Sequence, residues 1–331
     1  MSLSSNYKPR VSVTKQLPKE VEERMVKLFD TTLRHTSSSM TQDELKSAIA
    51  NCEVFVPTVT DIINSDIISA ASDKLRLIAN FGAGTDHIDI NFAHQRGIIV
   101  TNTPGVLTED TADLTMALIL AVPRRLVEGD RRARSGKFEG WTPTFMLGHR
   151  IKGKRLGIIG MGRIGQAVAR RAKAFGLEVH YHNRSRLPAG IEDTLDATYW
   201  PTLDPMLPSI DIVVITCPST PETYHLINKK RLKLLSPTSY SVNTSRGEVI
   251  DEKALAIALS NGELSGAGLD VYEDEPQIHP DLIKLQNVIL SPHIGSATYE
   301  SRQEMGEKVM INIRAMVDGH AYPDRVLPRS E

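Results

Sequence analysis

Disulfide-forming cysteine pairs, long apolar runs and an excess of one charge are all missing from this sequence. Cys52 and Cys217 are its two cysteines and lie far apart, so the sequence predicts reduced thiols rather than a disulfide framework. No apolar run approaches the roughly 20 residues that cross a bilayer. The N-terminal stretch MSLSSNYKPR has no apolar core of the kind a secretory signal needs. We therefore expect a cytoplasmic protein with no membrane partner.

The charges nearly cancel. Lys and Arg number 39 and Asp and Glu number 40, which leaves a formal net charge of -1. Broad binding of nucleic acid needs a basic surface, so nucleic acid is not expected as a partner, although a small local anion pocket is not excluded. A length of 331 residues suits two domains, and 40% hydrophobic residues is ordinary for a soluble enzyme.

Strand-like and helix-like patches alternate along the chain. RVSVT (10–14) is followed by a helical pattern over 18–29, and LRLIANFG leads through DINFAHQRG to IIVTN in the same way. The second half repeats the order, beginning at KRLGIIGMGRIG (154–165). Alternation of this kind predicts α/β folding with parallel sheets.

Three further segments are expected to connect or complete these units. Residues 109–136 predict one long helix kinked at Pro123. The Gly-, Pro- and aromatic-rich residues 137–153 predict a loop or arm. Residues 297–319 predict an amphipathic helix with Met305, Val309, Ile311 and Ile313 on its apolar side.

A glycine-rich loop follows the apolar strand predicted at 155–159. GIIGMGRIG places Gly160, Gly162 and Gly165 in the spacing G-x-G-x-x-G, with a helical pattern after it. The first glycine permits a tight turn, the second lets a pyrophosphate approach the backbone, and the third lets the helix pack closely on the strand. The helix N-terminus then offers N–H groups to phosphate. We interpret the loop as a dinucleotide site rather than an ordinary strand–turn–helix.

The next strand ends in HYHNRSR (180–186), where an NAD site usually carries an acid about 20 residues beyond the glycines. Asn183 stands there, and it cannot repel a 2′-phosphate by charge. Arg184 and Arg186 can pair with such a phosphate, and Ser185 can donate one hydrogen bond. Two solvated surface arginines are the alternative. We predict a preference for NADP(H) over NAD(H).

A metal site is not predicted. His180 and His182 alternate on the same strand, but no cysteine or acid cluster completes a set of ligands.

Three later stretches place polar residues at the ends of apolar strands, where open α/β sheets bind ligands. They are SVNTSRGEVID with Arg246, GLDVYEDEP with Asp270 and Glu275, and ILSPHIGSAT with His293. Together with NFGAGTDHID (80–89) and TNTPGVLTEDTAD (101–113), these motifs cover residues from about 75 to 310. The chain resembles the D-isomer-specific 2-hydroxyacid dehydrogenases, and most of all their glyoxylate/hydroxypyruvate reductase branch.

The resemblance implies a catalytic set. Arg246 would hold the substrate carboxylate and carbonyl oxygen with its planar fork. His293 would give a proton to the carbonyl oxygen as hydride reaches the adjacent carbon. Glu275, the acid directly before Pro276, would orient the ring and favour its protonated form, although Glu273 and Asp274 are acidic neighbours.

The resemblance also implies the remaining site residues. Asp270 would bind the nicotinamide carboxamide, and Cys217 has no nucleophilic partner and would pack beside the cofactor. The full set of implied cofactor contacts is Thr111, Gly160, Gly162, Arg163, Ile164, Asn183, Arg184, Ser185, Arg186, Cys217, Pro218, Thr223, Thr244, Asp270, His293 and Gly295.

Substrate contacts are implied at two places. Ala83 and Gly84 would offer backbone N–H groups to the substrate carboxylate, although a plain tight turn is the alternative. Trp141, near Phe145 and Met146, would border the pocket from a dimer arm, unless these residues form a surface cluster without a role.

We expect two Rossmann-like or flavodoxin-like domains with parallel sheets and an active-site cleft between them. Residues 1–103 and 294–331 would form the substrate domain, and 104–293 the dinucleotide-binding domain. The predicted reaction is NADPH-dependent reduction of glyoxylate or hydroxypyruvate to glycolate or D-glycerate by a homodimer. The alternatives are an NADH-linked dehydrogenase of phosphoglycerate or a bulkier 2-keto acid, and a cofactor-sensing, corepressor-like binding protein.

Overall fold

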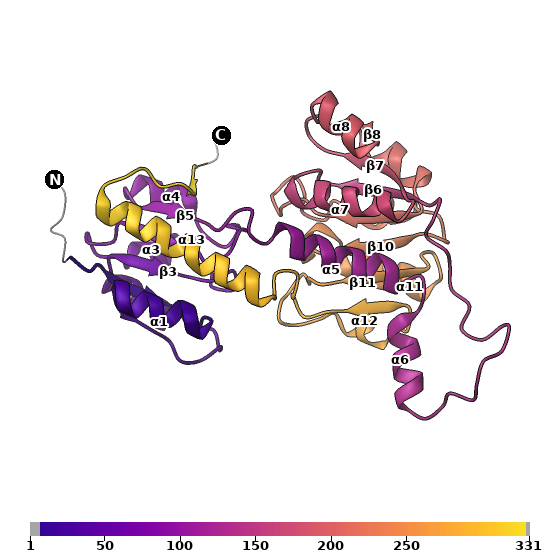
Figure 1. Cartoon of the computed structure of the whole chain (residues 1–331), viewed down its shortest axis with the longest axis horizontal. Coiled ribbons are helices and arrows are strands. Elements are labelled where there is room, and N and C mark those ends of the chain that lie inside the picture. Colours follow the sequence, from indigo (N-terminus) through magenta and orange to yellow (C-terminus); the bar gives the residue numbers. More distant parts are fainter. Residues whose placement is uncertain (1–6, 329–331) are drawn as a thin grey trace. The chain divides into compact units, whose positions relative to one another are not determined.

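A computed structural model describes residues 7–328 of the chain. The described residues divide into two compact units, 7–107 with 297–328 and Thr108–Ser296. The sequence predicted divisions at 103/104 and 293/294, a few residues earlier at each junction. Each unit has helices on both faces of a largely parallel sheet, which confirms the predicted α/β class (Figure 1). The active-site cleft between the domains stays a prediction.

The first unit is built on a sheet of order β13-β5-β4-β3-β1-β2, parallel except for β13. Its strands are β1 (Arg10–Val13), β2 (Asp30–Thr32), β3 (Val54–Val56), β4 (Leu77–Ala79), β5 (Ile99–Thr101) and β13 (Arg325–Val326). Its helices are α1 (Lys19–Leu28), α2 (Gln42–Ala50), α3 (Ser65–Ser69), α4 (Ile90–Gln95) and α13 (Tyr299–Asp318). β3 and β4 are wholly buried because apolar clusters cover both faces of the sheet.

The second unit is built on a parallel sheet of order β12-β11-β10-β9-β6-β7-β8. Its strands are β6 (Arg155–Ile159), β7 (Glu178–His182), β8 (Ala197–Trp200), β9 (Ile212–Ile215), β10 (Tyr240–Asn243), β11 (Gly266–Leu269) and β12 (Val288–Leu290). The strand order reverses between β6 and β9. Ligands of open α/β sheets bind at such a switch point, so this edge is where a site is expected.

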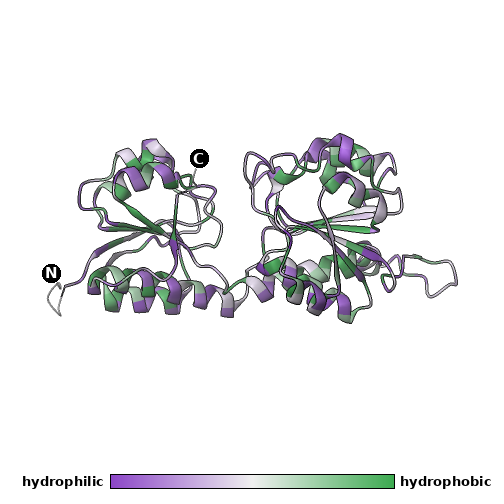
Figure 2. Cartoon of the chain, turned by 90° about the horizontal axis from the view of Figure 1, so that it is seen from above, coloured by the Kyte–Doolittle hydropathy of each residue, from purple (hydrophilic) through white to green (hydrophobic). Residues whose placement is uncertain are grey.

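Helices cover both faces of this second sheet. They are α5 (Thr108–Ala121), α6 (Leu126–Arg134), α7 (Arg163–Ala174), α8 (Ala189–Leu195), α9 (Leu203–Met206), α10 (Lys229–Leu232), α11 (Glu252–Ser260) and α12 (Pro280–Lys284), with short 3-10 turns η1 (Leu207–Ser209) and η2 (Gly247–Val249). One apolar core includes α5 and α7, and another includes α9 to α12. In Figure 2 the strands are mostly green and the helices carry both green and purple, because each helix packs an apolar face on the sheet and exposes a polar one.

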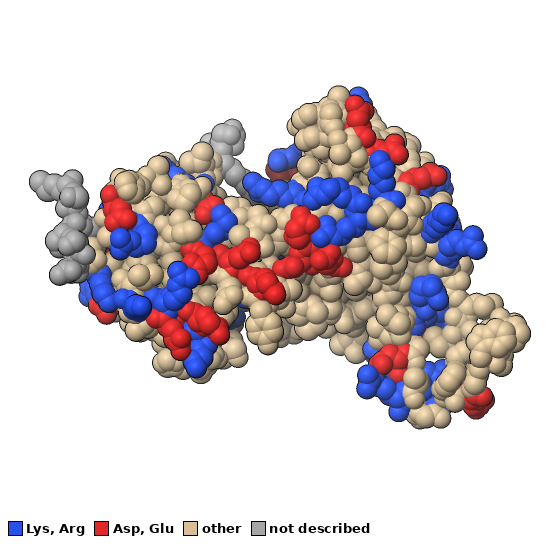
Figure 3. Space-filling model, in the orientation of Figure 1, with Lys and Arg blue, Asp and Glu red and all other residues tan. Residues whose placement is uncertain are grey.

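Ion pairs join α5 to α7 at the surface. Arg171 contacts Asp113 at 2.6 Å and Glu109 at 2.8 Å. Figure 3 shows basic and acidic side chains intermixed in the same way on both units. The face in view therefore has no broad surface on which all the charged side chains have the same sign.

The long helix predicted over 109–136 is wrong. α5 ends at Ala121 and α6 begins at Leu126, with Arg125 between them at φ 53°. Pro123 has no backbone N–H to continue the helix, and the left-handed Arg125 redirects the chain. The segment after α6, residues 137–150, contains turns and no regular element, as predicted.

The C-terminal helix is confirmed as α13, but its predicted apolar face is partly wrong. Met305, Val309 and Ile313 recur every four residues and are buried, whereas Ile311 is 51% exposed. Ile311 points away because two residues along a helix turn the side chain about 200° from its neighbour's direction. No helix among the described residues is long and apolar enough to span a membrane.

Candidate active site

The glycine loop between β6 and α7 is shaped by contacts that exclude side chains. Gly160 has φ 99°, and a Cβ there would lie 2.6 Å from the backbone nitrogen of Cys217. A Cβ on Gly165 would lie 2.3 Å from the carbonyl oxygen of Gly160. A Cβ on Gly162 would meet no atom within 4 Å, so this glycine faces open space. Gly160 and Gly165 therefore allow close contact between parts of the backbone, whereas Gly162 leaves space that a bound group can occupy.

The N-terminus of α7 borders that space. Gly162 is its N-cap and has no side chain to accept from the first-turn N–H groups, which include those of Arg163 and Ile164. A helix N-terminus without a side-chain cap suits an anion such as a pyrophosphate. The residues present therefore fit a dinucleotide.

The loop at the end of β7 contains no carboxylate from Asn183 to Arg186. Arg184 and Ser185 are exposed, and the Asn183 amide donates to the Ser185 carbonyl at 3.0 Å. Arg186 is not a free cation. Its side chain is 66% exposed, but its guanidinium donates hydrogen bonds to the buried carboxylate of Glu192 on α8.

The two β7 histidines have structural partners. His180 Nδ1 accepts from the Trp200 indole at 3.1 Å, and His182 Nδ1 lies 2.9 Å from the Trp200 carbonyl. Burial lowers the pKa of His180, which favours the neutral form of its ring. Within residues 7–328 no group of three or more metal-ligating side chains is present.

A histidine–carboxylate pair lies beyond the carboxyl ends of β11 and β12. His293 Nδ1 is 2.8 Å from Glu275 Oε2, and the backbone N–H of Tyr272 donates to Glu275 Oε1 at 3.1 Å. Glu273 contacts His225 at 2.6 Å instead. The geometry therefore distinguishes between the neighbouring acids, which the sequence left ambiguous.

His293 is held in a strained conformation. Its φ of 53° is left-handed, which costs a residue with a Cβ about 1–2 kcal/mol. The buried carboxylate of Asp270 holds the following turn, accepting from the N–H groups of Ile294 and Gly295 at 2.8 Å each and from Ser291 Oγ at 2.6 Å. Asp270 thus fixes the loop that carries His293. Its predicted contact with nicotinamide stays a prediction.

Glu275 remains ionised in this setting. Burial opposes ionisation, but the hydrogen bond to His293 and the charge of Arg246 outweigh it, so the pKa of Glu275 lies below its usual value. An ionised Glu275 fixes the ring by accepting at Nδ1. This leaves Nε2 of His293 as the nitrogen that can give up a proton to another molecule.

Arg246 stands just after β10, at the start of the turn η2. The Asn243 amide donates to the Arg246 carbonyl at 2.8 Å, and Arg246 Nη1 donates to the Ser245 carbonyl at 2.8 Å. The arginine is half-buried at the carboxyl edge of the same sheet as His293.

Several predicted cofactor residues converge within this unit. Thr115 Oγ1 donates to the Thr111 carbonyl and lies 2.8 Å from Thr244 Oγ1, which brings α5 beside the end of β10. A Cβ on Gly295 would lie 3.2 Å from Asp270 and 3.3 Å from Thr111. The end of β11 and the turn after β12 therefore meet the first turn of α5.

The loop after β9 completes that edge. Thr223 Oγ1 donates to the Pro218 carbonyl at 2.8 Å, which closes the loop. Burial raises the pKa of the Cys217 thiol to about 11, so Cys217 is a packing residue rather than a nucleophile.

Ala83 and Gly84 lie in the other unit, after β4, in a loop whose carbonyls are tied back. The Asn80 amide donates to the carbonyls of Gly82 (3.0 Å) and Gly84 (2.9 Å). The Asn102 amide donates to the Ala83 carbonyl at 2.7 Å. Sequence reasoning missed both asparagines: Asn80 directly precedes the glycine-rich turn, but Asn102 follows β5 and reaches the turn only in the folded chain. Their donors draw the loop carbonyls to one side.

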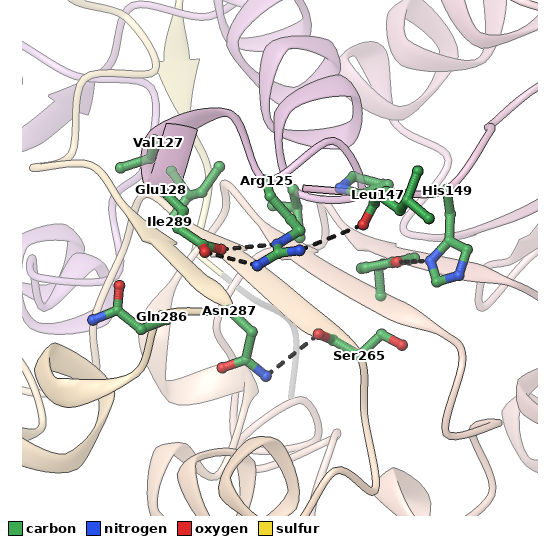
Figure 4. Close-up of a pocket in the computed structure, with 13 residues that line it drawn as sticks. Arg125, Val127, Glu128, Leu147, His149, Ser265, Gln286, Asn287 and Ile289 are labelled. Atoms are coloured by element: carbon green, nitrogen blue, oxygen red, sulfur yellow. Dashed lines mark hydrogen bonds and ion pairs between the residues drawn. The ribbon is translucent and has the colours of Figure 1, made fainter. Parts of the chain in front are cut away.

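Trp141 is not brought to any of these groups. It lies in the loop after α6 with 82% of its surface exposed. A separate pocket of about 300 Å³ lies under the start of α6, lined by Arg125, Glu128, Leu147 and His149 among others (Figure 4). Arg125 bridges Glu128 and the Leu147 carbonyl there, and His149 contacts Tyr240. None of the predicted catalytic residues lines it.

Residues 116–295 match the family model of the D-isomer specific 2-hydroxyacid dehydrogenase NAD binding domain. The chain belongs to this family.

Relatives match over nearly their whole length. A glyoxylate reductase of Thermococcus litoralis is 44% identical over 96% of this chain and 97% of its own. A crystal structure of a putative D-isomer specific 2-hydroxyacid dehydrogenase from Polaromonas is 37% identical with a TM-score of 0.91, covering 97% of this chain and 100% of that one. An NADPH-dependent glyoxylate/hydroxypyruvate reductase of Sinorhizobium meliloti, solved with NADP and malonate, is 34% identical with a TM-score of 0.85 over 97% of each chain.

Proposed function

We propose that this dehydrogenase reduces glyoxylate or hydroxypyruvate to glycolate or D-glycerate and prefers NADPH. The observation that carries the reaction is the 2.8 Å contact of Glu275 with His293, whose ring nitrogen Nε2 is left for a substrate. The names of the Thermococcus and Sinorhizobium relatives support the substrates. We also propose a cytoplasmic enzyme.

His293 acts as the general acid. Its ring, oriented through Nδ1 by an ionised Glu275, donates the Nε2 proton to the carbonyl oxygen of the 2-keto acid. When bound, the nicotinamide supplies the hydride. The pair of heterolytic transfers, proton to oxygen and hydride to carbon, converts the ketone or aldehyde into an alcohol with no other reactant.

Arg246 polarises the carbonyl. Its guanidinium donates hydrogen bonds in a fixed plane, which suits a carbonyl oxygen next to a carboxylate. Positive charge from Arg246 near that oxygen stabilises the negative charge that develops as hydride arrives.

The Gly82–Gly84 loop holds the substrate carboxylate. With its carbonyls bound by Asn80 and Asn102, the N–H groups of Ala83 and Gly84 are available as a small anion nest. Recognition through backbone N–H groups selects a carboxylate and places little demand on the rest of the substrate. Such a site accepts small 2-keto acids that differ beyond the reacting carbon.

The preference for NADPH rests on the loop after β7. Asn183, Arg184 and Ser185 carry no negative charge toward the ribose position, and Arg184 and Arg186 add positive charge. A 2′-phosphate gains a charge-assisted hydrogen bond where an aspartate would repel it.

The exposed arm supports a homodimer. Leu126, Phe138, Trp141 and Leu147 are each at least 59% exposed on α6 and the loop after it. Such a run of exposed apolar side chains is typical of an association surface. Light scattering should give a mass twice that of the chain, and Trp141 would then lie in an interface beside the substrate.

The function is tested by steady-state assays of NADPH loss with glyoxylate and hydroxypyruvate. We expect turnover with both, and its loss in His293→Ala with NADPH binding retained. A protein that binds NADPH but turns over neither substrate would be a cofactor sensor instead, and the proposal would be wrong.

A further inference from the structure

The loop that bears Arg184 and Arg186 is fixed from beneath by side chains of three elements. Tyr199 on β8 donates to the Asn183 carbonyl at 3.3 Å. The Leu187 N–H donates to Tyr181 Oη on β7 at 2.9 Å. Tyr181 in turn donates to Glu192 on α8. Both ends of the loop are therefore anchored, and its exposed tip holds Arg184 and Ser185.

Glu192 is the buried centre of this arrangement. Only 7% of its side chain is exposed, compared with 66% of the side chain of Arg186. Arg186 Nε lies 3.1 and 3.0 Å from the two Glu192 oxygens, and Nη2 lies 2.8 Å from one of them. These hydrogen bonds from Arg186 hold the pKa of Glu192 below its usual value. The carboxylate is thus an ionised partner for one edge of the guanidinium.

The Nη1 side of the guanidinium is not bound to Glu192. Nη1 makes no contact with Glu192, and the guanidinium carbon lies 5.7 Å from the centre of the Tyr199 ring. A guanidinium gripped through Nε and Nη2 is restricted to one plane. An arginine restrained before a ligand arrives loses less side-chain entropy when it binds that ligand.

We propose that Glu192 is a positioning residue for cofactor choice, holding Arg186 so that its Nη1 side meets the 2′-phosphate of NADPH. This inference rests on the proposed NADPH preference and adds a residue outside the glycine and arginine motifs. Glu192 lies nine residues beyond Asn183 and touches the cofactor only through Arg186. Its negative charge would by itself oppose a phosphate, so its contribution is geometric.

Glu192→Gln is the decisive variant, because glutamine keeps the size but weakens the grip on Arg186. We expect the KM for NADPH to rise about tenfold, the loss of one charge-assisted hydrogen bond. The KM for NADH and kcat should stay within about twofold, since neither involves the 2′-phosphate. Calorimetry should show the same loss for adenosine 2′,5′-bisphosphate and none for AMP.

Asp193→Asn is the matched control. Asp193 is the exposed neighbour of Glu192 on α8, so its replacement removes the same formal charge without touching Arg186. We expect the affinity for adenosine 2′,5′-bisphosphate to stay the same or rise slightly. In Glu192→Gln combined with Arg186→Ala, the KM for NADPH should equal that of Arg186→Ala alone, because the two residues act as one unit.

Three results would overturn the inference. They are an unchanged or lowered KM for NADPH in Glu192→Gln, an equal rise for NADPH and NADH, and additive effects in the double variant. If Glu192→Gln does not fold, Arg186→Lys replaces it, since lysine keeps the charge but cannot grip both oxygens in one plane; a KM for NADPH as in the native protein would then contradict the proposal. Arg184→Ala tests the NADPH preference itself, because it leaves the Glu192 contacts intact.

Discussion

His293 combines a left-handed backbone with a fixed ring, and both properties come from carboxylates. Asp270 holds the turn that follows it, and Glu275 holds the ring at 2.8 Å. Strain of this kind persists where surrounding contacts over-determine a residue, which is common at functional sites. At the scale of single residues, Asp270 therefore fixes the backbone of the proposed proton donor and Glu275 fixes its ring.

Removing the charge of Glu275 should reduce catalysis. We expect Glu275→Gln to lower kcat about 10²-fold, within the range that general acid catalysis contributes. Stopped-flow and steady-state assays with saturating NADPH measure the loss.

Glu273→Gln is the control for this prediction. Glu273 sits two positions earlier but contacts His225 rather than His293. Its kcat should stay close to that of the native enzyme. A loss of kcat as large as that of Glu275→Gln would show that the general charge of the loop, rather than the direct contact with His293, matters for catalysis.

The same carboxylate makes stability depend on pH. The pKa of Glu275 in the folded chain lies below its usual value of 4.5. Its contribution is therefore complete above about pH 4.5 and is lost as the pH falls through the folded-state pKa. The difference in Tm between native protein and Glu275→Gln should be largest near neutral pH and shrink in acid. A difference that grows below pH 4.5 would contradict the assignment.

At the scale of elements, the β6–α7 turn depends on backbone contacts that only glycine allows. In the β6–α7 turn, Gly165 is packed against a carbonyl, and Gly162 faces open space. We expect Gly165→Ala to destabilise folding by about 1–3 kcal/mol through overpacking. Gly162→Ala should leave the Tm nearly unchanged but weaken NADPH binding, because its methyl group occupies the cofactor space.

Thermal melts and NADPH titrations of the two variants separate these effects. Equal losses of Tm in both would contradict the division of roles. Equal NADPH affinity in Gly162→Ala and the native protein would show that the open space is not the pyrophosphate site.

The turn after β4 depends on the side-chain amide of Asn80, which donates to two carbonyls of the turn. Asn80→Ala should free the Gly84 carbonyl, while the Thr103 N–H still donates to the Gly82 carbonyl, and we expect the KM for glyoxylate to rise about tenfold with the KM for NADPH unchanged. Steady-state kinetics with each substrate varied in turn measure the split. A higher KM for NADPH alone would place this loop at the cofactor instead.

Patterns along the chain predicted the elements that were strongly apolar or strongly punctuated. The predicted strand at 155–159 matches β6, and the glycine spacing correctly placed the turn before α7. β8 was missed because this edge strand has only four residues and none of them is fully buried, so it shows no alternation of buried and exposed positions. The break between α5 and α6 was underestimated because it depends on a left-handed Arg125 that no local residue preference announces.

The residues of the candidate site also fall into those that local sequence identifies and those that only the folded structure reveals. Residues inside motifs, such as His293 and Glu275, were found because their neighbours in sequence identify them. Glu192 and Asn80 were not found, because each acts through contacts that only folding creates. Arg186 was identified but not its ion pair, since α8 was not predicted.

At the scale of the whole molecule, the units divide the predicted tasks. Thr108–Ser296 contains the glycine loop, the arginine loop and the His293–Glu275 pair, and the other unit contains the Ala83–Gly84 turn. A two-substrate reaction suits this division, because one unit is predicted to bind the dinucleotide and the other the substrate carboxylate.

We propose a 2-keto acid reductase whose ribose-end loop selects NADPH. This selection is tested most directly by kcat/KM for NADPH and for NADH, measured with saturating glyoxylate under one set of conditions. We expect a ratio of about ten or more in favour of NADPH, equivalent to one charge-assisted hydrogen bond. A ratio near one, or a preference for NADH, would contradict it.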